Sequence, residues 1–251
     1  MNITARDVQL LRYLHTVKVA TYKQIQRDVY PDYKLRSVCN RLAKLERRRL
    51  VTGSQNRLHS CGDRVISVSK EGFEKFIAKG EELRCELKSE AITHDLNLVD
   101  IRHSLMKLEK VSFYATENQI QTWGDTENGI ESIDLVRLNS DALMKIHSPK
   151  KEVWCAVEYE DSEKASKRYE PIVKKYYLSG EIGAVFYVCK SENLVRKISK
   201  IESTLFPGDQ PKFFYQVKHA LHKNDVISFF NCNGFTLNFT TKKPDEQVMN
   251  Y

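Results

Sequence analysis

The spacing of apolar residues in the first 68 positions constrains the fold more than any other feature of this chain. Three runs have helical spacing: one after Thr4, one after Thr21, and one from about Tyr33 to Arg49. The two threonines are predicted N-caps, and Pro31-Asp32 marks a turn. Residues 50–52 and 64–68 then alternate like strands around a polar loop. Three short helices and a hairpin predict a winged helix-turn-helix domain over residues 1–80.

Charge is distributed unevenly between this region and the rest of the chain. Residues 1–80 hold 17 Lys+Arg against 7 Asp+Glu, a net charge of +10, whereas residues 81–251 hold 23 against 26, a net charge of −3. These values account for the net charge of +7 of the whole chain. A basic N-terminal part predicts contact with a polyanion such as DNA.

The outward face of the third predicted helix carries the side chains suited to reading DNA. Asn40 and Arg41 are the predicted base-reading residues, because Asn pairs with adenine and Arg with guanine in the major groove. Further predicted DNA contacts, to bases or phosphates, are Arg36, Ser37, Lys44, Arg48 and Arg57. A solvated helix face, or a helix-turn-helix that docks another protein, has the same pattern, so these two alternatives stay open.

Other features exclude several classes of protein. The six cysteines are scattered singly and form no C-x-x-C pair, which argues against a zinc site. The chain lacks a Walker A motif, a G-x-G-x-x-G motif, a G-x-S-x-G motif and the His-hydrophobe-His pair of tyrosine relaxases. It also has no apolar run of about 18 residues and no signal-like N-terminus, so we expect a cytoplasmic protein without membrane contact.

Residues 81–251 alternate between strand and helix periodicity, which predicts a mixed α/β domain. After a long helix from about 81 to 110, predicted strands are 111–115, 133–138, 142–147, 153–160, 184–189, 213–217, 226–230 and 235–239, and predicted helices are 70–79, 163–179 and 192–204. The helix from 163 between two strands is a predicted right-handed β-α-β crossover.

Carboxylates on neighbouring strands are the main candidates for chemistry. Asp141 opens one predicted strand, and Glu158 and Glu160 end the next, where alternation aims both glutamates to the same side. Such a set can bind Mg²⁺ or Mn²⁺ and support phosphodiester hydrolysis. Lys174, on the following helix, is the predicted catalytic lysine, on a stripe with residues 167, 170 and 177. Solvated acidic residues at strand ends are the competing interpretation.

Several short segments carry a resemblance to a known family. They are Thr4 to Leu11, His94-Asp95-Leu96, Ser140-Asp141-Ala142, Val157-Glu158-Tyr159-Glu160, and Lys174 with Tyr177. In this order they resemble the replication-relaxation family, which includes the MOBC class of plasmid relaxases, over residues 4 to about 190. Two departures are Ser140, where the family has proline, and Tyr159-Glu160, where E-x-K nucleases have lysine.

The resemblance implies a restriction-endonuclease-like core, related to PD-(D/E)xK nucleases, over residues 81–251. It implies that Asp141 and Glu158 bind the metal, with Glu160 a third ligand, Lys174 the catalytic lysine and His94 an accessory residue. Its substrate would be double-stranded plasmid DNA at an origin of transfer, with an accessory mobilisation protein and a second copy of the chain as further partners. A non-catalytic regulator or replication accessory protein, and a restriction or repair endonuclease, stay open as alternatives.

Overall fold

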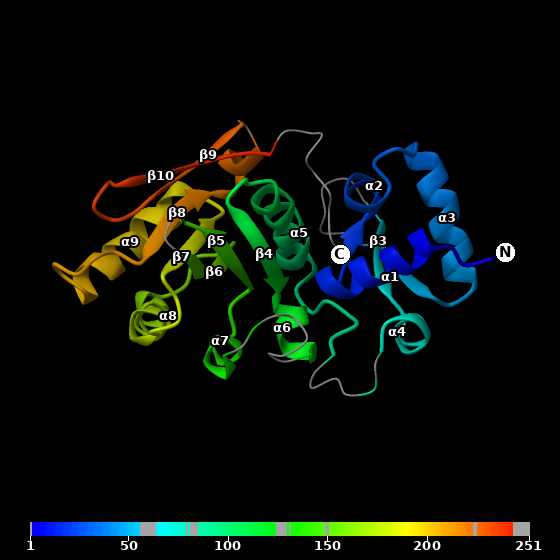
Figure 1. Ribbon diagram of the computed structural model, residues 1–251, viewed down its shortest axis with the longest axis horizontal. Coiled ribbons are helices and arrows are strands. Elements are labelled where there is room, and N and C mark those ends of the chain that lie inside the picture. Colours follow the sequence, from blue (N-terminus) through cyan, green and yellow to red (C-terminus); the bar gives the residue numbers. More distant parts are fainter. Residues whose placement is uncertain are drawn as a thin grey trace. The chain divides into compact units, whose positions relative to one another are not determined.

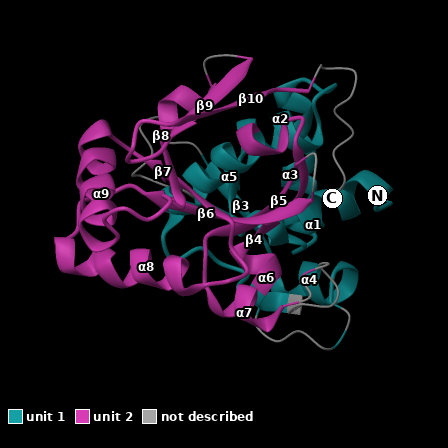
Figure 2. Ribbon diagram, turned by 60° about the vertical axis from the view of Figure 1, so that its left-hand side comes forward, with its two compact units in different colours: residues 1–103, 121–124, 249–251 teal, residues 104–120, 125–248 magenta. Residues whose placement is uncertain are grey.

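A computed structural model describes residues 2–55, 64–78, 80, 85–123, 130, 132–148, 151–222 and 225–242. The fold is mixed α/β, as the alternating periodicities predict. It divides into two compact units (Figure 2): unit 1 is Met1–His103 with Gln121–Gly124 and Met249–Tyr251, and unit 2 is Ser104–Ile120 with Asp125–Val248.

Unit 1 consists of short helices and a small antiparallel sheet (Figure 1). Its elements are α1 (Ala5–Val17), β1 (Ala20–Thr21), α2 (Tyr22–Val29), α3 (Leu35–Arg47), β2 (Val51–Gln55), β3 (Arg64–Val68), α4 (Lys70–Phe76) and most of α5 (Ile92–Met106). The strand order is β1-β3-β2. The predicted pairing of residues 64–68 with the strand before them is confirmed, since Val51 lies opposite Val68 and Gln55 opposite Arg64.

Both predicted N-caps of unit 1 are confirmed. The side chain of Thr4 accepts a hydrogen bond from the Asp7 amide, and the Asp7 carboxylate accepts one from the Thr4 amide in return. Thr21 and Gln24 form the same reciprocal arrangement at the start of α2. Each capping box satisfies amides that a helix start leaves without partners, which is why these helices begin at positions the sequence marks.

Polar contacts attach α5 to α2 within unit 1. The Gln24 side chain donates to the Leu96 carbonyl at 2.9 Å, and Arg27 pairs with Asp100 at 2.9 Å. The buried Asp28 carboxylate lies 2.7 Å from Nδ1 of His103. The division between the units falls within α5, between His103 and Ser104. The sequence analysis assigned residues 1–80 and 81–251 to two domains and placed their boundary within or just before the helix predicted from about 81 to 110.

Unit 2 is built on a seven-stranded sheet in the order β10-β9-β8-β7-β6-β5-β4. The strands are β4 (Val111–Thr116), β5 (Ala142–His147), β6 (Glu152–Glu160), β7 (Ala184–Cys189), β8 (Phe213–Val217), β9 (Val226–Phe230) and β10 (Thr236–Thr240). The pairs β6-β7 and β7-β8 are parallel and the others antiparallel. The predicted β-α-β crossover is confirmed, because α8 (Ser166–Leu178) connects the parallel neighbours β6 and β7.

Two helices cover one face of this sheet, α8 and α9 (Glu192–Leu205). The buried Tyr169, Val173 and Tyr176 of α8 pack in one cluster with Ile198 of α9 and with Ala156 of β6. The hairpin β9-β10 packs its aromatic rings toward the middle of the sheet, since Phe229 and Phe239 both contact Phe186 of β7.

The two edges of the sheet meet at one corner. Residues just before β4 pair with the end of β10 in a short antiparallel bridge between Leu108 and Thr241. The Glu109 amide donates to the Thr240 carbonyl at 3.0 Å, and the Lys242 amide donates to the Lys107 carbonyl at 2.6 Å. These hydrogen bonds satisfy backbone groups at this corner that would be exposed at an open sheet edge.

Two sequence predictions for elements were wrong, and one element was not predicted. Residues 133–138, predicted as a strand, contain the short helix α7 (Ile133–Arg137). Of the helix predicted over 81–110, the described residues 92–106 form α5, whereas residues 85–91 have no regular structure. The helix α6 (Glu117–Trp123) follows β4 directly and was not predicted. Among the described residues, no helix is long and apolar enough to span a bilayer.

Candidate active site

Two carboxylates come together in unit 2 from neighbouring antiparallel strands. Asp141 directly precedes β5, and Glu158 lies near the end of β6, one residue beyond the Ala142–Val157 pair. The Asp141 carboxylate accepts a hydrogen bond of 2.7 Å from the amide of Tyr159, which fixes it against β6. The antiparallel register of β5 and β6 therefore brings these two residues next to each other, as the sequence predicted.

Glu158 is largely buried, with 14% of its side chain exposed, and three groups act on its charge. Burial and the nearby Asp141 carboxylate raise the pKa of Glu158 to about 8, while Lys175 and the hydroxyl of Tyr176 act in the opposite direction. Lys175 Nζ lies 3.7 Å from Glu158 Oε1, and Tyr176 donates a hydrogen bond to the same oxygen. Burial and the Asp141 charge therefore favour the protonated form of this carboxyl.

The lysine that lies beside Glu158 is Lys175, and not Lys174, which the sequence predicted as the catalytic lysine. The side of α8 that packs on the sheet carries Tyr169, Val173 and Tyr176, which leaves Lys174 exposed to solvent. Lys175 Nζ donates to the Leu138 carbonyl at 2.5 Å and lies beside Glu158. The 4-and-3 spacing of the two tyrosines and the valine is the sequence signal that would have fixed the helix phase.

Glu160 is not placed as a third ligand beside Asp141 and Glu158. Its side chain is almost fully buried and pairs with Lys164 Nζ at 2.8 Å, with a further hydrogen bond from the Ser162 amide. In the part of the chain that the structure describes, no three His, Cys, Asp or Glu residues form a group able to hold a metal ion. The sequence analysis predicted that this helix begins at Glu163, which would place Lys164 on it. In the structure α8 begins at Ser166, so Lys164 precedes the helix and its side chain pairs with Glu160.

The pair Asp141 and Glu158 still suits one hard divalent cation. Mg²⁺ is commonly held by one or two carboxylates and otherwise by water and substrate oxygens, so two carboxylates from rigid strands are a sufficient protein contribution. The pairing of Ala142 with Val157 places Asp141 and Glu158 next to each other at the end of these two strands. The donor set therefore fits Mg²⁺ or Mn²⁺ bound by two protein ligands.

Tyr176 is a hydrogen-bond donor in this arrangement. The side chain is fully buried, and burial together with the Glu158 carboxylate raises the pKa of Tyr176 well above its ordinary value. A buried phenol that keeps its proton is a poor nucleophile.

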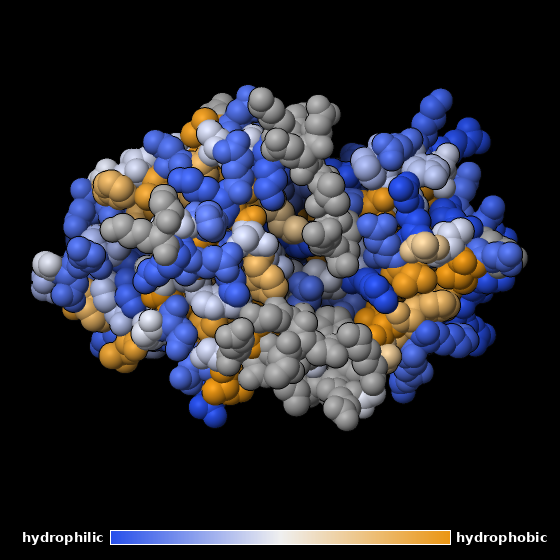
Figure 3. Space-filling model, in the orientation of Figure 1, coloured by the Kyte–Doolittle hydropathy of each residue, from blue (hydrophilic) through white to orange (hydrophobic). Residues whose placement is uncertain are grey.

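The predicted DNA-binding face of unit 1 is exposed on α3. Hydrophilic side chains gather over α3 in the space-filling view (Figure 3). The exposed residues among those predicted to contact DNA are Arg36, Ser37, Asn40, Lys44 and Arg48. Arg57, the predicted contact in the hairpin loop, lies outside the described residues.

Arg41 is occupied by another contact. Its guanidinium binds the carboxylate of Asp7, which is 1% exposed, and the carbonyl of Asn2. Burial alone would raise the pKa of Asp7, but the hydrogen bonds from Arg41 and Thr4 outweigh it and hold the pKa below the ordinary value. Arg41 thus links α3 to the start of α1, and the prediction that it reads bases loses its basis.

His94 belongs to unit 1, on α5, and the paired carboxylates belong to unit 2. Its Nδ1 lies 3.6 Å from the carboxylate of Asp95 in the same helix.

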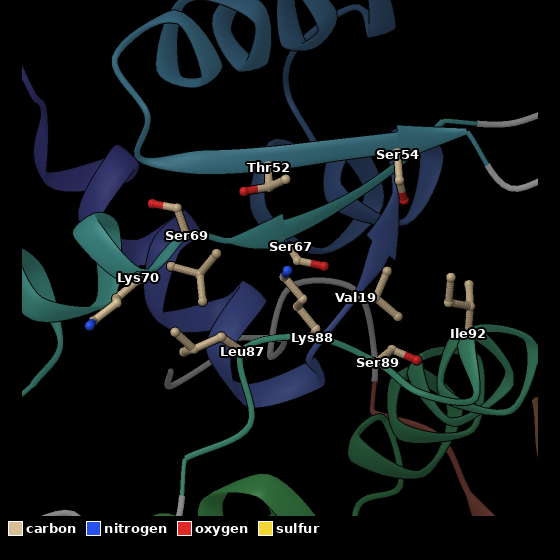
Figure 4. Close-up of a pocket in the computed structure, with 11 residues that line it drawn as sticks. Val19, Thr52, Ser54, Ser67, Ser69, Lys70, Leu87, Lys88, Ser89 and Ile92 are labelled. Carbon is tan, nitrogen blue, oxygen red and sulfur yellow. The ribbon is translucent and has the colours of Figure 1, made fainter.

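A hollow of about 330 Å³ in unit 1 has a different character (Figure 4). Thr52 and Ser54 of β2 and Ser67 of β3 face Leu87, Lys88 and Ser89 of the segment before α5. Its lining, as far as the structure describes the chain, offers hydroxyls and lysines but no carboxylate, thiol or imidazole, and these described residues do not supply the groups that hydrolysis requires.

No protein-family model, curated protein or solved structure matches this chain.

Proposed function

We propose that this protein is a DNA-processing endonuclease of a mobile element, in which unit 1 binds double-stranded DNA and unit 2 nicks it with Mg²⁺ or Mn²⁺. The single observation that carries the proposal is the convergence of Asp141 and Glu158 from adjacent strands, with Lys175 beside them. In this proposal unit 1 is a winged helix-turn-helix and unit 2 a restriction-endonuclease-like core. The resemblance of the motif order to the replication-relaxation family suggests a plasmid origin of transfer as the substrate.

The order of elements in unit 1 supports the DNA-binding part of this proposal. Two helices lead into α3, whose exposed face carries Arg36, Asn40 and Lys44, and an antiparallel hairpin follows. A helix of this kind enters the major groove, where Asn40 can pair with an adenine edge and the cations with phosphates. The net charge of +10 on residues 1–80 provides the general attraction to DNA.

The surroundings of the carboxylates suggest how each residue contributes to hydrolysis. A divalent cation bound here supplies positive charge for the phosphate oxygens and activates water. Asp141, which accepts a hydrogen bond from the Tyr159 amide, and Glu158, which accepts one from Tyr176, are the residues that would hold this cation. Lys175 provides a second positive charge that stabilises the developing charge on a scissile phosphate.

Nicking of supercoiled plasmid carrying the native locus tests the proposal. We expect nicking that requires Mg²⁺ or Mn²⁺, is abolished by Asp141→Asn and by Glu158→Gln, and falls by roughly 10²–10³-fold in Lys175→Ala. Lys174→Ala is the matched control, because Lys174 is the neighbouring, exposed lysine of the same helix and should leave the rate unchanged. Equal rates in Lys175→Ala and Lys174→Ala would remove the lysine from the mechanism.

The placement of Glu160 favours a second candidate, a winged-helix regulator with a nuclease-like domain that does not cleave. Its ion pair with Lys164 leaves only two carboxylates at the site. Sequence-specific DNA binding without metal-dependent nicking, by wild-type protein in the assay above, would select this candidate.

A further inference from the structure

A hollow of about 270 Å³ lies in unit 1 where the beginning of α1 meets the beginning of α3. Residues of both helix starts and of the turn between α2 and α3 line it: Arg6, Asp7, Tyr30, Tyr33, Ser37 and Arg41. It borders the exposed face of α3, because Ser37 belongs to both.

Tyr30, which lines this hollow, carries a buried hydroxyl group. Tyr30 is only 5% exposed, and no partner for its hydroxyl exists among the residues that the structure describes. Burial raises the pKa of Tyr30, so the group stays a donor at physiological pH. A buried polar group without a partner costs stability, and such groups are kept where a ligand completes them.

The charges around the hollow favour an anion. The guanidinium of Arg6 lies 5.9 Å from the ring centre of Tyr30 and 5.3 Å from that of Tyr33. Asp7 is the acidic residue of the lining, and its charge is taken up by Arg41. Arg6 therefore contributes a positive charge that no carboxylate of the lining offsets.

The first turn of α3 adds to this preference. α3 begins after Lys34 without any side-chain cap, whereas α1 and α2 begin with capping boxes. The Ser37 amide donates to the Lys34 carbonyl, so the preference of this turn for a negatively charged group comes from the positive end of the helix dipole. The hydroxyl of Ser37, in the same turn, offers one more donor.

We infer that this hollow binds a phosphate group of the DNA backbone, held by Arg6, the Tyr30 hydroxyl and the first turn of α3. This inference rests on the proposed binding of DNA by unit 1. The bound phosphate fixes the register of α3 on the duplex, because Asn40 lies one helical turn or less beyond Ser37 on the exposed face.

Equilibrium binding of labelled duplexes by the full chain, over a range of KCl concentrations, tests the inference. We expect Arg6→Ala to weaken binding to cognate and scrambled duplexes alike and to reduce the slope of log affinity against log salt by about 1. Arg12→Ala is the matched control, because Arg12 is an exposed arginine of the same helix outside the hollow. This substitution should leave the affinity for both duplexes unchanged.

Tyr30→Phe separates a ligand contact from a structural role. It should weaken DNA binding by roughly three- to tenfold without changing the salt slope, because it removes a donor but no charge. The same change should raise the midpoint of thermal unfolding, because it removes a buried hydroxyl without a partner. If the hydroxyl had only a structural role, Tyr30→Phe would lower both the DNA affinity and the midpoint of thermal unfolding, or would lower neither.

Duplexes with single methylphosphonate linkages identify the phosphate. One substitution should reproduce the loss seen in Arg6→Ala, and it should have no further effect on that variant. Wild-type affinity in both Arg6→Ala and Tyr30→Phe would overturn the inference while leaving DNA binding by α3 intact. Binding of inorganic phosphate to the hollow by a chain that binds no duplex would also overturn it, and would count separately against the proposed function.

Discussion

Glu158 carries a carboxyl group whose protonation is set by its neighbours. Its pKa of about 8 results from burial and from the Asp141 charge, so the folded protein retains a proton that the unfolded chain releases near the ordinary value of 4.5. A raised carboxyl pKa costs stability as the pH rises above 4.5, and the cost is complete above about 8.

Glu158→Gln removes this titration. In metal-free solution we expect the variant to gain stability over the wild type as pH rises from about 4.5 to about 8, by on the order of a few kcal/mol at the upper end. Urea unfolding at several pH values measures the difference. Glu181→Gln, at an exposed position, should show no such trend, and a constant difference between Glu158→Gln and wild type would refute the assigned pKa.

Arg41 and Asn40 are neighbours on α3. We expect substitution of Arg41 to lower stability and substitution of Asn40 to weaken DNA binding. Arg41→Ala leaves the buried carboxylate of Asp7 without its partner, so we expect a loss of roughly 1–3 kcal/mol of stability at neutral pH, moderated by the exposure of Arg41. The pKa of Asp7 is lowered by folding, so its contribution is present above the ordinary value of 3.8 and disappears as the pH falls further. The deficit of Arg41→Ala should therefore shrink in acid.

Asn40→Ala should leave the unfolding curve unchanged and weaken binding to the cognate duplex alone, by about 1–3 kcal/mol. Chemical unfolding and duplex binding of the two variants together distinguish a base-reading residue from a structural one. A stability loss in Asn40→Ala matching that of Arg41→Ala would show that Asn40 has a structural role and is not the base-reading residue.

At the scale of elements, strands were predicted better than helix boundaries. The bounds of β7, β8 and β9 match the prediction, because each is a short apolar run bounded by polar or turn residues. The segment 133–138 has similar apolar content but contains the helix α7, because a short apolar run does not by itself distinguish a strand from a helix.

Helix phase decided how much of the candidate site was predicted. Asp141 and Glu158 were found because strand alternation has a period of two, and one register fixes every side chain. Lys175 was missed because a helix moves a side chain by about 100° per residue, so choosing the wrong stripe on α8 selected Lys174. The tertiary contact to Leu138 that fixes Lys175 joins segments far apart in the sequence.

The first part of α5 contributes to the stability of unit 1 through its contacts with α2. A fragment of residues 1–103 retains the contacts of Gln24, Arg27 and Asp28 with α5, whereas a fragment of residues 1–80 loses them. We expect the longer fragment to unfold cooperatively and the shorter one to be less stable by roughly 2–4 kcal/mol, since the buried Asp28 loses a partner. Circular dichroism with urea compares the two, and equal stability would place the boundary at residue 80 after all.

At the scale of the whole molecule, each unit has its own core and its own balance of charge. Leu11, Leu14 and Ile25 belong to the core of unit 1, whereas Val185, Phe213 and Tyr215 belong to that of unit 2. Separate cores are consistent with the separate roles that we propose for binding and for hydrolysis.

The corner where β10 meets the residues before β4 has a consequence for the order of events during synthesis. Most of unit 1 has emerged once residue 103 leaves the ribosome, so its core can form early. Unit 2 cannot close until Thr241 and Lys242 reach Leu108 and Lys107, which were made more than half a chain earlier. The strands made earlier therefore keep open edges until residues 241 and 242 have been synthesised, and unpaired edges in this interval favour aggregation of the nascent protein.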